Sequence, residues 1–171
     1  MRRILLVYYS RTGTTRELAR QIAALCGADL EEIQDRVGRG GALGLLRSLA
    51  EALLHICPPI SPSQHAPRAY DLVIIGTPVW AGQPASPVRS YVRRHHDSFR
   101  RVALFCTCSG DNGSAALQPL QRLCGQPARA ALALSQADIA NGQQGLPIGR
   151  FLRRMLGRHA MGPQTEASRA A

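Results

Sequence analysis

Residues 4–15 read ILLVYYSRTGTT and join an apolar run to a loop rich in hydroxyl groups. The run at residues 4–9 is apolar throughout, which is typical of a parallel strand that is buried on both faces. Apolar residues then recur at helical spacing over residues 13–25. This order predicts a buried strand, a tight turn at Gly13 and a helix, which is how many α/β folds begin.

The rest of the chain repeats this alternation of strand and helix. Apolar runs predict four further strands, at residues 28–33, 71–76, 102–106 and 128–134. Helical spacing predicts four further helices, at residues 43–56, 88–95, 115–123 and 148–156. Such alternation predicts a parallel sheet with helices on both faces. A sheet of this kind binds ligands beyond the carboxyl ends of its strands.

The size and composition indicate one globular domain. Of the 171 residues, we expect 1–158 to form the domain and 159–171 to be a disordered tail. No apolar run approaches the roughly 20 residues that span a bilayer, and no secretory signal is recognisable, so we expect a cytoplasmic protein. The five cysteines match no zinc pattern. We therefore predict no metal site, and we assign no catalytic side chain.

The charge is strongly positive and is carried by arginine alone. The chain has 21 basic residues, none of them lysine, and a formal net charge of +10. The charge indicates an anionic partner. The alternative is a genome whose codons favour arginine, which gives the protein a basic surface that is merely solvated. The arginines are not interleaved with stacking aromatic residues, so we predict no specific nucleic-acid binding. Peripheral contact with an anionic surface stays open.

The loop after the first predicted strand has the residues of a phosphate site. It comprises Ser10, Arg11, Thr12, Gly13, Thr14 and Thr15. A helix that begins here presents unpaired backbone N–H groups and the positive end of its dipole, and the hydroxyl groups add donors. An ordinary helix cap is the alternative, but a cap needs only one such side chain. We predict that the loop binds a phosphate group.

Two later loops have the residues of a platform for a planar ligand. The first comprises Thr77, Pro78, Val79, Trp80, Ala81 and Gly82, and it holds the only tryptophan of the chain. Trp80 is predicted to cover a ring, with core packing as the alternative. The second comprises Thr107, Cys108, Ser109, Gly110 and Gly113, whose small size lets the backbone approach a ligand. Neither Cys106 nor Cys108 is followed by the arginine of a phosphatase loop.

These loops resemble those of flavodoxins. Ser10, Thr12, Gly13 and Thr15 fit the family pattern [ST]-x-T-G-x-T, and residues 76–80 read GTPVW, as in a group of bacterial flavodoxin-domain proteins. The resemblance implies a flavodoxin-like, doubly wound, five-stranded parallel sheet in the order 2-1-3-4-5. It also implies that residues 10–15 hold the phosphate of flavin mononucleotide (FMN), with the two later loops around the flavin ring.

Two departures from the flavodoxin pattern affect the expected function. The loop at 107–113 has no tyrosine to cover the second face of the ring, and a more open ring favours a reacting substrate. Familiar flavodoxins are strongly acidic, whereas this chain is at +10. We therefore expect a less negative potential for the second electron than in acidic flavodoxins.

The sequence thus predicts an FMN-binding redox protein that carries electrons between a reductase or NAD(P)H and an acceptor. The partner is either a redox protein or a small electron acceptor. One alternative is an FMN-dependent reductase or oxidase that acts on a quinone or a porphyrin precursor. The alternative of another class is a flavodoxin-like binding module without flavin. The donor, the acceptor and the oligomeric state stay open.

Overall fold

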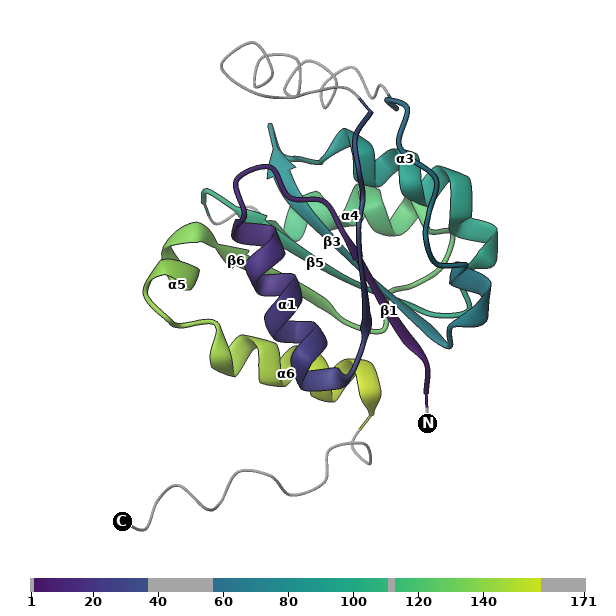
Figure 1. The fold of residues 1–171 in the computed structure, drawn as a ribbon. Helices are drawn as coiled ribbons and strands as arrows, with labels where there is room; N and C mark the ends of the chain where they lie inside the picture. The colour runs from purple at the N-terminus through teal and green to yellow at the C-terminus, as the bar shows by residue number, and fades with distance from the viewer. Residues whose placement is uncertain (1, 37–56, 111–112, 158–171) are drawn as a thin grey trace.

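The computed structural model describes residues 2–36, 57–110 and 113–157, which form a parallel β-sheet with helices on both faces (Figure 1). The strands of the sheet are β1 (Ile4–Tyr8), β2 (Asp29–Glu32), β3 (Leu72–Trp80), β5 (Val102–Cys108) and β6 (Ala131–Ser135). Their order is β2-β1-β3-β5-β6, and every neighbouring pair is parallel. The predicted five-stranded order is confirmed, since β4 (Gln83–Pro84) lies off this path and pairs only with β3.

Among the described residues, two helices pack on each face of the sheet. The helices are α1 (Thr14–Cys26), α3 (Ser86–His95), α4 (Gly113–Leu123), α5 (Gln136–Ala140) and α6 (Gly145–Leu156), with short 3-10 turns η1 (Pro67–Ala69) and η2 (His96–Ser98). Leu5 and Val7 of β1 belong to the core under α3 and α4, whereas Leu6 belongs to the core under α1 and α6. Successive strand residues point to opposite faces, so burial on both faces requires the continuous apolar runs of the sequence.

Several boundaries differ from the predicted ones. β3 extends to Trp80 because its end pairs with β4, and β5 extends to Cys108 because its end pairs with β6. α5 was not predicted, although its capping box of Ser135 and Asp138 is a helix-start signature. The predicted helix at 43–56 and the predicted tail at 159–171 lie outside the described residues.

The end of β3 forms a hairpin with β4, where the sequence predicted a loop. Val79 pairs with Pro84 and Trp80 with Gln83, so the chain reverses at Ala81 and Gly82. Their φ angles are +47° and +73°. Two positive φ angles are the requirement of a type I′ turn, which matches the twist of paired strands. Gly82 suits this conformation, whereas the Cβ of Ala81 makes it strained.

Replacing Ala81 by glycine is expected to stabilise the protein by about 0.5–1 kcal/mol. The substitution removes the left-handed strain, of roughly 1–2 kcal/mol, and part of that gain is offset by the greater freedom of glycine in the unfolded chain. Ala81 is exposed, so no packing is lost. The free energy of unfolding in urea is the measurement. Gly82→Ala is the matched control and is expected to destabilise; a less stable Ala81→Gly protein would contradict the turn geometry.

Candidate functional site

The structure brings the three predicted loops together at the carboxyl ends of β1, β3 and β5. The hydroxyl groups of Thr15 and Thr107 lie 2.8 Å apart and join the first loop to the third. The rings of Tyr9 and Trp80 meet edge to face, with centroids 5.7 Å apart, and join the first loop to the second. One ligand can therefore contact all three loops at once.

The first loop is shaped to present the start of α1. The Gly13 N–H donates to the Ser10 hydroxyl at 3.1 Å, which closes the turn, and Gly13 has φ +98°. α1 begins at the next residue, and its first helical bond runs from the Glu17 N–H to the Gly13 carbonyl at 2.9 Å. No side chain of the described residues caps α1, so the N–H groups of its first turn stay available to an anion.

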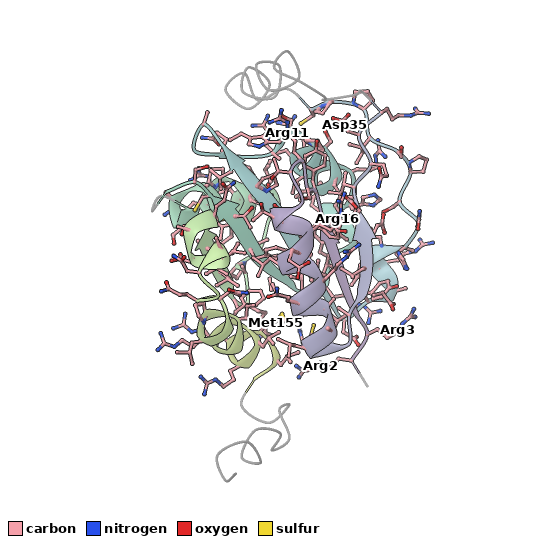
Figure 2. All side chains as sticks on the ribbon, turned by 60° about the vertical axis from the view of Figure 1, so that its left-hand side comes forward. Arg2, Arg3, Arg11, Arg16, Asp35 and Met155 are labelled. Atoms are coloured by element: carbon pink, nitrogen blue, oxygen red, sulfur yellow. The ribbon has the colours of Figure 1, made fainter. Side chains whose placement is uncertain are left out.

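The hydroxyl groups of the first loop differ in their exposure and in their hydrogen bonds. Thr12 is exposed, and its hydroxyl lies 3.5 Å from that of the half-buried Thr14. Thr15 is only 2% exposed and bonds to Thr107, so its hydroxyl fixes the loop and is not turned toward a ligand. Arg11 is half-buried and lies at this end of the molecule (Figure 2). Among the hydroxyl groups, those of Thr12 and Thr14 are therefore accessible to a ligand, as is the backbone around Gly13.

A half-buried ion pair fixes the start of α1 against the sheet. Arg16 contacts both carboxylate oxygens of Glu32 in β2, at 2.7 and 3.1 Å. The Tyr8 hydroxyl donates to the same carboxylate at 3.2 Å, and burial, with the Glu32 charge, raises the pKa of Tyr8. The bidentate geometry is the strong form of this interaction, so it holds the first loop in one position.

The second loop is anchored by Thr77 and holds Trp80 in the core. The buried Thr77 hydroxyl donates to the Pro78 carbonyl and accepts from the Ala85 N–H, both at 2.9 Å, so it fastens the base of the hairpin. Trp80 is 8% exposed and packs edge-on against Tyr9. Stacking on a ligand would require the indole to turn outward. Ala81 and Gly82 are exposed, while Pro78 and Val79 are half-buried.

The third loop begins inside β5. Cys108 is buried, and its thiol donates to the Gly110 carbonyl at 2.7 Å. Ser109 and Gly110 are exposed and continue the edge formed by the other loops. Gly113 starts α4, and a Cβ there would lie 2.8 Å from Cys108 Sγ and 2.9 Å from Ala133 Cβ. Gly113 therefore lets α4 approach β5 closely and has a packing role.

The buried thiols are expected to be unreactive in the folded protein. Burial raises the pKa of Cys106 and of Cys124 to about 12. At pH 8 the thiolate fraction is then on the order of a thousandfold below that of an unfolded cysteine with pKa near 8.5. Iodoacetamide labelling read by mass spectrometry should modify the half-buried Cys57 first, and Cys106 only in denaturant. Rapid labelling of native Cys106 would contradict this and favour thiol chemistry.

Two buried polar atoms next to the second loop were not singled out by the sequence. Gln83 Oε1 in β4 and Ser86 Oγ at the start of α3 are buried and have no hydrogen-bond partner within the described residues. A bound ligand or an ordered water would satisfy them. No sequence signal could have found them, because their burial depends on the hairpin fold.

The part of the chain that the structure describes shows no group of three or more histidine, cysteine, aspartate or glutamate side chains that could hold a metal ion. None of its helices is long and apolar enough to cross a membrane.

The fold and the site define a class: a doubly wound α/β protein whose first strand is followed by a hydroxyl-rich loop and an uncapped helix start. The family model described as flavodoxin matches residues 3–142, and the chain belongs to the flavodoxin family. The predicted membership of the flavodoxin family is thereby confirmed. A comparison with curated protein sequences found no match.

Solved structures share the fold at low sequence identity. A flavoprotein from Lactobacillus acidophilus in complex with FMN has a TM-score of 0.67 and 24% identity, over 84% of this chain and 98% of that chain. Its apo form has a TM-score of 0.58 and 24% identity, over 82% and 96%. A flavodoxin variant from Fusobacterium nucleatum bound to FMN has a TM-score of 0.57 and 13% identity, over 91% and 96%.

Proposed function

We propose that the chain binds FMN at the carboxyl ends of β1, β3 and β5 and carries electrons in the cytoplasm between a reductase or NAD(P)H and an acceptor. The observation that carries this proposal is the uncapped start of α1 behind the positive-φ Gly13. Membership of the flavodoxin family and the FMN complexes of similar folds support it.

The residues at this edge fit the cofactor. A Cβ added at Gly13, Gly82 or Gly110, one residue in each loop, would meet no atom within 4 Å, so each loop borders open space. The first-turn N–H groups of α1 and the hydroxyls of Thr12 and Thr14 would hold the phosphate. The backbone near Gly82 and Gly110 would approach the ring. The flavin supplies the redox chemistry, and the protein supplies binding, orientation and electrostatics.

One observation favours an enzyme over a simple carrier. The loop at 107–110 consists of small residues, two of them exposed, and provides no aromatic cover for a ring. A ring left open on one side is accessible to a small acceptor such as a quinone or a porphyrin precursor. Turnover of NADH with a soluble quinone by the FMN-loaded protein would support the enzyme. Electron exchange only with a redox protein would support the carrier.

The first experiment is a visible spectrum of the purified protein, before and after addition of FMN. Oxidised-flavin bands, with quenching of the single tryptophan, would support the proposal because Trp80 lies at the site. Absence of binding at micromolar FMN would remove the redox function and leave the flavin-free binding module.

The positive charge is expected to raise the potential for the second electron relative to acidic flavodoxins. At about 10 Å in a water-like dielectric, each unit charge contributes roughly 0.4 kcal/mol. Several such charges would sum to one or two kcal/mol, on the order of 50 mV for one electron. Potentiometric titration at low and high salt is the measurement, and the difference should shrink as salt screens the +10 charge. A strongly negative second potential at low salt would contradict it.

A further inference from the structure

A basic cavity lies at the amino ends of the strands, at the opposite edge of the sheet from the loops. Its volume is about 220 Å³, and its charged lining comprises Arg2, Asp71, Arg101, Arg129 and Arg154. Figure 2 shows Arg2 and Met155, which also lines the cavity, at the far end of the molecule from Arg11. Between the two edges runs β5, whose 7 residues span about 20 Å at roughly 3.3 Å each.

The arginines of this cavity come from separate elements held in place by the sheet. Arg101 precedes β5, and its carbonyl accepts from the Val73 N–H at 2.9 Å. Arg129 precedes β6, and its N–H donates to the Val102 carbonyl at 2.8 Å. Strands β5 and β6 are parallel neighbours, so these two residues start adjacent strands. Arg2 Nη1 donates to the Leu156 carbonyl at the end of α6, at 2.9 Å.

The positive charge of the cavity is not balanced by the carboxylates that the structure describes. Asp71 is the one acidic residue of the lining, and it already accepts from the Arg3 N–H at 3.0 Å and from Arg100 at 3.5 Å. No ion pair within the described residues involves Arg101, Arg129 or Arg154. A second depression, lined by Arg150, Arg153, Arg154 and Gly157, continues the basic surface beyond the cavity.

The C-terminal end of α6 accounts for only part of this cluster. Arg153 and Arg154 lie in the last turn of α6, where the helix dipole favours cations. Arg101 and Arg129 lie before strands and have no helix end to complement. The positive charges of these neighbouring arginines repel one another, and a bound anion would offset that repulsion.

We propose that this cavity binds a pyrophosphate group of a phosphorylated ligand. Guanidinium groups donate in a planar fork that matches phosphate oxygens, and four of them balance a highly charged anion. A cavity of about 220 Å³ is many times the roughly 10–15 Å³ that one water needs, so it has room for the nine non-hydrogen atoms of a pyrophosphate. Because the cavity lies at the far edge of the sheet, the ligand binds together with FMN and does not compete with it.

Inorganic pyrophosphate is the probe, titrated by calorimetry at a constant ionic strength of about 0.15 M. The full chain is used with Thr12→Glu, which blocks the loop at residues 10–15, so that the titration reports the cavity alone. This protein should bind one pyrophosphate. Adding Arg101→Gln with Arg129→Gln should weaken that binding by about tenfold or more. The charge-matched control adds Arg20→Gln with Arg122→Gln, at two exposed residues outside the cavity, and it should bind like the Thr12→Glu protein.

The same variants distinguish the source of the phosphate. Cosedimentation with phosphatidylcholine vesicles containing phosphatidic acid, lost in the Arg101/Arg129 variant alone, would assign a lipid headgroup. Binding of soluble pyrophosphate without vesicle binding would assign a soluble ligand. The proposal is overturned if pyrophosphate does not bind the Thr12→Glu protein at about 1 mM, or if both added pairs of substitutions weaken it equally. None of these results depends on whether FMN binds.

Discussion

Thr12→Glu is expected to weaken FMN binding at least about 100-fold and to leave the fold intact. Thr12 is exposed, so its replacement removes no core packing. A carboxylate about 5 Å from a phosphate dianion is repelled by between about 2 kcal/mol in a water-like dielectric and about 7 kcal/mol at an effective dielectric near 20. A 100-fold loss corresponds to about 2.7 kcal/mol, within that range. Fluorescence titration of Trp80 with FMN is the measurement.

Riboflavin and a neutral variant show whether the effect acts on the phosphate. Riboflavin lacks the phosphate, so Thr12→Glu should change its affinity by no more than about threefold. Thr12→Gln keeps the side chain polar without the charge. It should weaken FMN binding by no more than about tenfold, which is the net contribution of one hydrogen bond. Equal losses for FMN and riboflavin in Thr12→Glu would mean that the loop does not hold the phosphate. The proposed placement of FMN would then be wrong even if flavin binds elsewhere.

The sequence predicted the sheet because its physical signal is local. Strands such as β1 and β5 are buried on both faces and therefore read as continuous apolar runs. The uncapped helix start after β1 could likewise be predicted, because the strand, the hydroxyl-rich turn and the helix start are contiguous. What the sequence could not predict are contacts between distant segments. The hydroxyl of Thr15 belongs to the loop pattern, yet the structure directs it to Thr107, 92 residues away.

The same reason explains why the sequence predicted only one of the two proposed anion sites. The loop at residues 10–15 is one short segment, whereas the arginines of the basic cavity are spread from Arg2 to Arg154 and meet only in the folded chain. Trp80 is a case in which the local sequence signal was misleading. A tryptophan in a segment rich in glycine and proline favoured an exposed ligand platform, but the ladder of β3 extends far enough to carry it into the core. Tertiary pairing here overrides the local signal.

Gly76→Ala is expected to destabilise the protein by about 2–3 kcal/mol, the largest effect of any single methyl group that we predict. Gly76 lies opposite Phe105 across the β3–β5 ladder, and the Phe105 ring covers it. A Cβ at Gly76 would lie within 2.8 Å of three atoms of that ring, which is fully buried. Overpacking of this kind forces side chains off their rotamers and costs typically 1–3 kcal/mol. Urea unfolding is the measurement.

Gly149→Ala is the matched control, because the same methyl group has the opposite effect there. Gly149 lies inside α6, and a Cβ would meet no atom within 4 Å, so alanine should stabilise the helix by up to about 1 kcal/mol. Phe105→Leu in the Gly76→Ala protein should recover part of the loss, since a smaller side chain makes room for the methyl group. The double-mutant cycle should give a coupling of at least about 1 kcal/mol. Additive losses would show that the ring of Phe105 is not what excludes a side chain at Gly76.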